Sequence, residues 1–175
     1  MNKLQSLGII MDGNRRWARG EGLPPFEGHR RGFAKVKEVL QWANQAGVKT
    51  VFFYAFSTEN WQRGKTEVAV LMSLFLKFLK TEVADLIKRD TRLVFIGELG
   101  HFSRSLKKLI DEAMTTSKMC QSFTLAVALS YGGRREILEA AKVFSERYRD
   151  NFKNIGETEF SQCLWTAGLP DPDLI

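Results

Sequence analysis

Four short apolar runs alternate with longer helical patterns along the chain, and this alternation limits the fold more than any other feature of the sequence. The strand-like runs are Leu7–Met11, Thr50–Phe56, Arg92–Gly97 and Phe123–Leu129. Strands that alternate with helices are typical of parallel sheets, so we expect an α/β fold in which a parallel sheet is flanked by helices. The expected helices lie near Gly32–Gln45, Glu67–Arg89, Leu106–Ser117 and Arg135–Arg149, and Gly20–Gly28 is the expected loop.

Length and charge narrow the class of protein further. The 175 residues are enough for a domain with a real hydrophobic core, and we take residues 1–175 as a single domain. Lys and Arg number 26 against 20 Asp and Glu, which gives a net charge of +6. That excess favours an anionic partner, namely nucleic acid, an anionic membrane surface or a small phosphorylated substrate.

The sequence also points to a compartment. No apolar run reaches transmembrane length, and the first residues do not have the layout of a signal peptide. Cys120 and Cys163 lie far apart and match no CxxC pattern, which is typical of reduced thiols in the cytoplasm. We therefore expect a cytoplasmic protein whose contact with a membrane, if it makes one, is peripheral.

The expected helix over Glu67–Arg89 carries two apolar stripes, although a helix that covers a sheet needs only one. A well-buried helix or a dimer interface would explain the second stripe. A hydrophobic channel lined by that stripe would explain it equally, and would suit an amphiphilic substrate. The first stripe is Val68, Leu71, Met72, Phe75 and Leu79, and the second is Val70, Leu74 and Phe78.

Polar and charged side chains follow three of the expected strands. The segment from Asp12 to Arg16 comes after the first strand, Ser57 to Arg63 after the second, and Ser130 to Glu136 after the fourth. Ligands of open α/β sheets bind outside the carboxyl ends of the strands, where these three segments are expected to converge. Arginines there suit diphosphate oxygens, and a carboxylate suits a hard divalent cation.

Individual residues of these segments also have structural explanations. Asp12 and Gly13 match a common turn, and Glu67 is well placed to stabilise the start of its helix. His29, placed just before the next expected helix, is suited to donate to a phosphate or relay a proton, but a solvated helix start explains it as well. The convergence of the three segments is therefore a stronger indication of a ligand-binding site than any one motif.

Read together, these motifs closely resemble the cis-prenyltransferases, the family of undecaprenyl and dehydrodolichyl diphosphate synthases. The resemblance runs from about Leu7 to the end of the chain, with the motifs in order and suitably spaced. It implies an enzyme that repeatedly condenses isopentenyl diphosphate with an allylic diphosphate such as farnesyl diphosphate, making a long-chain cis-polyprenyl diphosphate. The motifs are Ile10 to Ala18, Gly28-His29, Tyr54 to Trp61 with Arg63 and Glu67, and Tyr131 to Arg134.

The resemblance also implies roles for single residues. Asp12 would bind Mg²⁺ and assist departure of the allylic diphosphate, and either Asn60 or Ser57 would lie near the proton that is removed. Phe56 would border the allylic substrate, while Trp61 and Glu67 would shape the site. The allylic diphosphate would be held by Gly13, Asn14, Arg15, Arg16 and His29 next to Trp17, and isopentenyl diphosphate by Ser57, Asn60 and Arg63.

The chain departs from the family pattern in three places. The loop Leu23–Phe26 lacks the basic residue that the family often has there, and Ser130 stands where the family commonly has Asn. The sequence stops just before an arginine-rich block of the family, so we expect the final strand and helices to be missing and the chain to be impaired.

Three functional classes are compatible with these residues. The first is the transferase, which the resemblance implies to be a homodimer when full length. The second is a non-catalytic subunit or diphosphate-binding fragment of a heteromeric prenyltransferase, but such a subunit would not need Asp12, His29, Asn60 and Arg63. The third is a nucleic-acid binder, which the charge alone suggests and which we do not expect.

Overall fold

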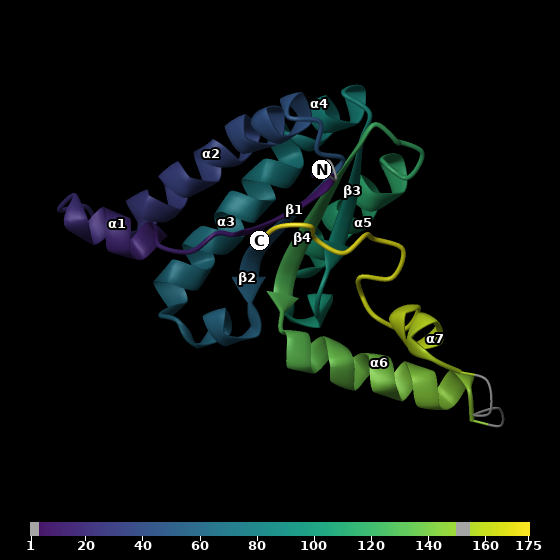
Figure 1. Cartoon of the computed structure of the whole chain (residues 1–175). Helices are drawn as coiled ribbons and strands as arrows, with labels where there is room; N and C mark the ends of the chain where they lie inside the picture. The colour runs from purple at the N-terminus through teal and green to yellow at the C-terminus, as the bar shows by residue number, and fades with distance from the viewer. Residues whose placement is uncertain (1–3, 150–154) are drawn as a thin grey trace.

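The structure, a computed structural model, describes residues 4–149 and 155–175 and contains a four-stranded parallel sheet (Figure 1). Its strands are β1 (Ser6–Ile10), β2 (Thr50–Ser57), β3 (Thr91–Ile96) and β4 (Phe123–Tyr131). They are ordered β1-β2-β4-β3, and every neighbouring pair is parallel. The expected α/β fold is therefore confirmed, and each strand lies within two residues of its expected bounds at both ends.

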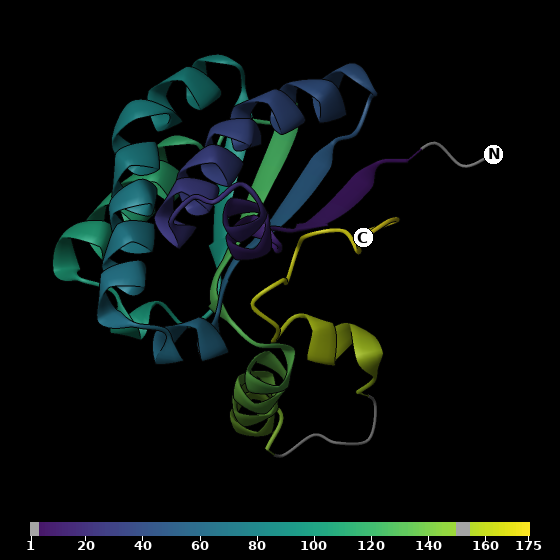
Figure 2. The same ribbon diagram turned by 90° about the vertical axis from the view of Figure 1, so that its left-hand side faces the viewer.

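Helices flank this sheet. In Figure 2, α2 and α3 cover one side of the sheet, while α7 and the C-terminal segment lie on the other side. The helices are α1 (Asn14–Gly20), α2 (Pro25–Gln45), α3 (Lys65–Thr81), α4 (Val83–Lys88), α5 (Arg104–Thr116), α6 (Gly133–Arg147) and α7 (Glu157–Ser161). Two short 3₁₀ helices, η1 (Thr58–Gln62) and η2 (Leu99–His101), follow β2 and β3.

The helix boundaries correct two expectations. The loop expected over Gly20–Gly28 is only a short turn, because α2 already begins at Pro25, whose fixed φ favours the first helical position. Consequently His29 lies inside α2 and not before it. The helix expected over Glu67–Arg89 is divided between α3 and α4 at Glu82, next to Thr81, whose hydroxyl donates to the carbonyl of Lys77 and bends the helix end.

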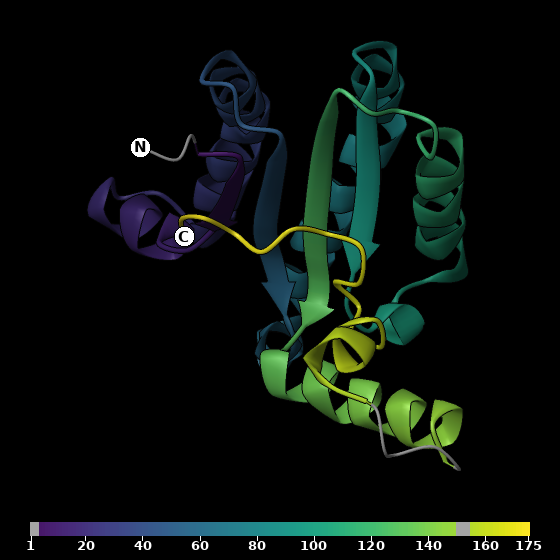
Figure 3. The same ribbon diagram turned by 45° about the vertical axis from the view of Figure 1, so that its right-hand side comes forward.

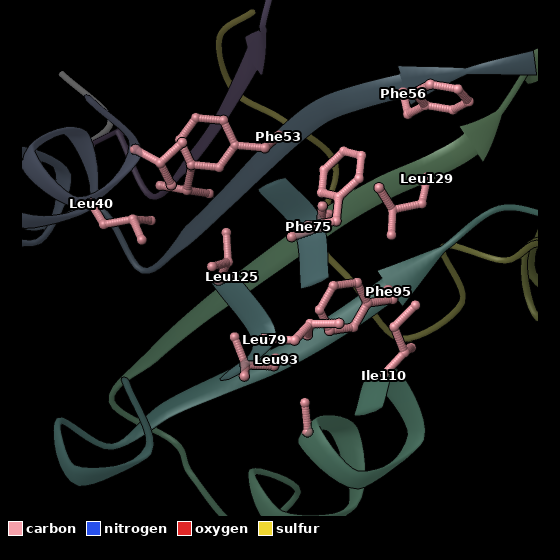
Figure 4. Close-up of a cluster of buried hydrophobic side chains, with 14 of the residues drawn as sticks. Leu40, Phe53, Phe56, Phe75, Leu79, Leu93, Phe95, Ile110, Leu125 and Leu129 are labelled. Atoms are coloured by element: carbon pink, nitrogen blue, oxygen red, sulfur yellow. The ribbon is translucent and has the colours of Figure 1, made fainter. Parts of the chain in front are cut away.

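The core lies between the sheet and the α2–α3 layer (Figure 4). Phe53 of β2 and Phe75 of α3 belong to this core, in which side chains from three strands meet those of the helices. A β-bulge between Tyr54 and Phe56 interrupts the alternation of β2. The bulge turns Phe56, which is fully buried, into the same core, where its ring lies 6.4 Å from that of Phe75.

A segment near the C-terminus lies along β1 (Figure 3). The N–H of Gly8 donates to the carbonyl of Leu174 at 2.7 Å. The Asp173 carboxylate accepts from the N–H groups of Gln5 at 2.8 Å and Ser6 at 2.9 Å. The C-terminal segment thus pairs with the free edge of β1. An unpaired edge would present its N–H and C=O groups to other molecules.

Candidate functional site

The three polar segments expected to converge do meet at the carboxyl edge of the sheet. The N–H of Met11 donates to the carbonyl of Tyr54 at 3.3 Å, which links the segment after β1 to the end of β2. The Tyr54 hydroxyl donates to the carbonyl of Tyr131 at 2.9 Å, which links β2 to the segment after β4. The convergence that the sequence predicted is therefore confirmed.

Glu67, in the first turn of α3, joins residues from three of these elements. Its Oε1 lies 3.0 Å from His29 Nε2, 3.0 Å from Arg63 Nη1 and 3.8 Å from Arg15 Nε. His29 is buried in α2, Arg63 follows η1, and Arg15 lies in α1. One carboxylate oxygen thus collects cationic or proton-donating groups from α1, from α2 and from the segment after β2.

The surroundings of Glu67 set its charge. Burial alone would raise the pKa of this carboxyl group, but the hydrogen bond to His29 and the charges of Arg15, Arg63 and His29 outweigh burial and lower the pKa. Glu67 is therefore ionised at neutral pH. An ionised carboxylate can keep the two guanidiniums close together without their mutual repulsion.

Asp12 lies in the turn between β1 and α1 and is exposed. Its Oδ1 accepts from the N–H of Gly13 at 2.6 Å, and its Oδ2 pairs with Arg16 Nη2 at 3.0 Å. Gly13 has a φ of +84°, in the left-handed region that glycine enters without strain. This turn presents a carboxylate and a guanidinium side by side to solvent.

Two glycines of α2 allow α1 to pack against it closely. A Cβ at Gly28 would come within 2.0 Å of the carbonyl oxygen of Asn14, and a Cβ at Gly32 within 2.3 Å of the Asn14 side-chain oxygen. Farther along α1, Trp17 stacks under Arg31, whose guanidinium carbon is 5.2 Å from the ring centroid. The glycines therefore bring α1, which carries Arg15 and Arg16, next to His29.

The segment after β2 forms η1, whose start is capped by its own side chains. Asn60 Oδ1 accepts from the N–H of Ser57 at 3.1 Å, within a capping box. The Trp61 ring packs against Phe56, with the ring centroids 4.9 Å apart. Phe56 is fully buried and touches Trp61 and Phe75, so its contact with an allylic substrate stays a prediction.

The segment after β4 contributes Ser130, Tyr131 and Glu136, for which no individual role was predicted. Trp61 Nε1 donates to Ser130 Oγ at 2.9 Å, and the Tyr131 hydroxyl donates to Glu136 at 2.5 Å. Burial and the neighbouring Glu136 carboxylate raise the pKa of Tyr131. A Cβ at Gly132 would lie 2.9 Å from the Thr58 side chain, so the segment approaches η1 closely at this glycine. Two signals in the sequence mark this segment, namely its position after a strand and the motif from Tyr131 to Arg134.

A cavity of about 410 Å³ lies between α2 and the α3–α4 pair, and charged side chains such as Lys37 and Glu82 line it together with apolar ones. Leu74 and Phe78 line it, which confirms for these two residues that the second apolar stripe faces a cavity. A narrow, wholly apolar space of about 30 Å³ continues over the sheet and reaches Met11, next to Asp12. The two spaces share Phe33, Val36 and Phe78, which separate the wider cavity from the site.

The donor set limits how a metal can bind. Among residues 4–149 and 155–175, no three His, Cys, Asp or Glu side chains are grouped as a metal site. Asp12 is a single exposed carboxylate beside Arg16. This arrangement fits Mg²⁺, which proteins often bind through one or two carboxylates while water and substrate phosphates supply the other oxygens.

Comparisons with known proteins agree with this geometry. The family described as "Putative undecaprenyl diphosphate synthase" matches residues 10–175. The chain is 41% identical over 172 residues to the ditrans,polycis-undecaprenyl-diphosphate synthase ((2E,6E)-farnesyl-diphosphate specific) of Micrococcus luteus, covering 97% of the chain and 69% of that protein. It is 42% identical over 172 residues to an isoprenyl transferase of Clostridium perfringens, covering 97% and 68%.

Solved structures give the same result. Lavandulyl diphosphate synthase from Lavandula x intermedia, in complex with dimethylallyl diphosphate, superposes with a TM-score of 0.91 at 32% identity. That match covers 98% of this chain and 76% of the plant chain. The structure of "a probable undecaprenyl diphosphate synthase" from Campylobacter jejuni gives a TM-score of 0.76 at 27% identity, covering 94% and 71%.

Proposed function

Because this chain belongs to the cis-prenyltransferases, the family of the undecaprenyl diphosphate synthases, we propose that it condenses isopentenyl diphosphate with an allylic diphosphate such as farnesyl diphosphate. The product is a long-chain cis-polyprenyl diphosphate. The observation that carries this proposal is the Glu67 cluster, where the groups proposed for two diphosphates meet at one carboxylate oxygen. The names of the relatives favour a transferase over a non-catalytic subunit.

The allylic diphosphate is proposed to bind over the turn after β1. Arg15 and Arg16 offer guanidiniums that suit phosphate oxygens, and His29 is held nearby by Glu67. Gly13 and Asn14 shape the turn that carries them, and Trp17 lies beside them on the same helix. When the bond between the allylic carbon and the diphosphate breaks, negative charge grows on the leaving oxygens, and these cations stabilise it.

Asp12 is proposed to hold Mg²⁺ together with the oxygens of the allylic diphosphate. The exposed carboxylate and the absence of a crowded donor set among the described residues support shared binding of this kind. The metal would supply further charge stabilisation for the leaving diphosphate. The hydrogen bond from Arg16 orients the Asp12 carboxylate in the turn after β1.

Isopentenyl diphosphate is proposed to bind at η1. Arg63 presents a guanidinium to its diphosphate, and Ser57 and Asn60 present polar atoms in the same turn. As the new carbon–carbon bond forms, the bond between the allylic carbon and its diphosphate breaks, and a proton passes from the isopentenyl unit to an oxygen of the departing diphosphate. Asn60 or Ser57 would lie near that proton. Trp61 and Glu67 shape this half of the site, and Phe56 supports it from the core.

The growing hydrocarbon is proposed to enter the space between α2 and α3. Supporting this, the narrow apolar space is lined by Met11, the neighbour of Asp12 in the sequence, and shares Phe33, Val36 and Phe78 with the lining of the wider cavity. Apolar walls favour an isoprenoid tail over water. In this arrangement the diphosphates react at the carboxyl edge of the sheet, and the hydrocarbon tail lies in the space between α2 and α3.

Assembly and location complete the proposal. We propose that residues 1–175 belong to one domain and that the enzyme forms a homodimer, supported by the exposed apolar side chains Ile137, Leu138 and Val143 of α6. We also propose a cytoplasmic enzyme with peripheral membrane contact, because its product is a lipid. Within the described residues, no helix is long and apolar enough to span a membrane, and Cys120 and Cys163 are free thiols.

A direct test supplies labelled isopentenyl diphosphate and farnesyl diphosphate with Mg²⁺ or with a chelator. We expect any long-chain product to form only with Mg²⁺, and a loss of about 10²-fold or more in the rate for Asp12→Asn. Asp111→Asn on α5, an exposed change of the same chemistry, is the control and should keep the wild-type rate. Product formation in the chelator, or equal rates for the two variants, would contradict the proposed role of Asp12.

A further inference from the structure

Ser130 occupies an unusual position at the end of β4. It is fully buried, and its φ of +52° lies in the left-handed region that residues other than glycine seldom adopt. The N–H of Glu98 donates to the Ser130 carbonyl at 3.2 Å, and Gly97 packs directly against the neighbouring Leu129 carbonyl. The main chain around Ser130 is therefore fixed on both sides, which sets the direction of its hydroxyl.

That hydroxyl accepts the hydrogen bond from Trp61 Nε1 at 2.9 Å, across 69 positions of sequence. The Trp61 ring is also held by apolar neighbours, with centroid distances of 4.9 Å to Phe56 and 5.3 Å to Phe102. Packing fixes the depth of the indole, but only the Ser130 hydrogen bond fixes the direction of its N–H edge. An indole N–H that loses its acceptor in such a packed position is left unpaired, which is unfavourable.

Trp61 stands in η1 between the two groups proposed for isopentenyl diphosphate, Asn60 and Arg63. We propose that Ser130 is a positioning residue for this half of the site, which it serves by anchoring Trp61 and, through it, η1. This inference rests on the proposed function. Without the anchor, η1 would populate other conformations, and apparent affinity falls in proportion to the fraction that remains competent.

The substitution Ser130→Ala removes the acceptor. We expect the KM for isopentenyl diphosphate to rise about tenfold, with kcat and the KM for the allylic diphosphate changed less than about twofold. Ser130→Gly removes the same oxygen but relieves the left-handed backbone, and should raise the KM equally. If Ser130→Ala alone raises it, backbone strain and not the hydrogen bond is the cause, and the proposal is wrong.

Ser117 provides a matched control. It is also a fully buried serine with a hydrogen bond, donated by the N–H of Leu93 at 2.9 Å, but it lies at the end of α5. Ser117→Ala should lower the free energy of unfolding to a similar extent without raising the KM for isopentenyl diphosphate. An equal rise in this control would reduce Ser130 to a general stabilising residue and overturn the proposal.

A second readout does not depend on turnover. In the ¹⁵N-labelled protein, Ser130→Ala should move the indole N–H resonance of Trp61, assigned with Trp61→Phe, and speed its hydrogen exchange about tenfold. The indole resonances of Trp17, Trp42 and Trp165 should stay in place. An unmoved Trp61 resonance in Ser130→Ala would overturn the anchor whether or not prenyl transfer is observed. If the resonance moves in the variant but the wild-type protein makes no product, only the proposed function is rejected.

Discussion

His29 Nε2 lies 3.0 Å from Glu67 Oε1, which joins α2 to the first turn of α3 across 38 positions of sequence. Arg63 Nη1 lies at the same distance from the same oxygen, so one carboxylate connects the proposed sites of both substrates. Either diphosphate would bind to groups that already pair with Glu67, namely His29 for one substrate and Arg63 for the other. The carboxylate therefore sets both the stability and the charge of the site.

Glu67→Gln should weaken the dependence of stability on pH. The folded-state pKa of Glu67 lies below its ordinary value of 4.5, so its ionised form contributes stability that is present above pH 4.5 and lost as the pH falls through the folded-state pKa. We expect the free energy of unfolding at pH 7 to fall by about 1–2 kcal/mol, with a flatter decline below pH 4.5. Urea denaturation at several pH values measures this.

The control for this experiment is Glu146→Gln, an exposed glutamate in α6. It should retain both the wild-type stability at pH 7 and the wild-type decline in acid. Identical curves for the two variants would show that the Glu67 cluster contributes nothing to folding.

Gly28→Ala should displace α1 and with it the proposed allylic site. The new Cβ would lie 2.0 Å from the Asn14 carbonyl oxygen, a contact that only movement of the helix can relieve. We expect a loss of about 1–3 kcal/mol in stability and a higher KM for the allylic diphosphate. Gly20→Ala, in α1 but with no atom within 4 Å of its Cβ, should do neither. Thermal unfolding and steady-state kinetics distinguish the two variants.

Phe78→Leu should shift the products toward longer chains. Phe78 lines both the narrow space at the site and the wider cavity, so a smaller side chain opens the passage between them. Reversed-phase separation of labelled products measures the shift. Phe144→Leu, in α6 outside this passage, should reproduce the wild-type distribution. Unchanged products in Phe78→Leu would mean that the passage does not limit chain length.

Lys37→Met should have a small effect that depends on salt. Lys37 Nζ of α2 pairs with Glu82 Oε2 at 3.0 Å beside the wide cavity, and the hydrogen bond from Lys37 lowers the pKa of Glu82. Partly exposed pairs of this kind contribute about 0.2–1 kcal/mol and are screened by ions. Denaturation at low ionic strength should separate the variant from wild type, and high salt should remove the difference. A difference that persists in high salt would contradict an ionic origin.

Local patterns were enough to predict the strands, the parallel sheet and the residues at its carboxyl edge. They were not enough for features that depend on distant contacts. The Ser130–Trp61 hydrogen bond joins positions 69 apart, and the break at Glu82 interrupts an unbroken apolar pattern. The start of α2 is different, because Pro25 at its first position is a local signal that indicates a helix start inside the expected loop.

The bulge in β2 shifts the inward–outward alternation of that strand by one residue. Upstream of it, alternate residues point into the core in the usual way, and downstream the phase is shifted so that Phe56 is again inside. A strictly alternating β2 of the same length would instead turn Phe56, and the residues that follow it, out of the core. The extra residue at Ala55 therefore keeps the Phe56 ring against Phe75, and the end of β2 depends on how many residues separate Phe53 from Phe56 rather than on which side chain Ala55 carries.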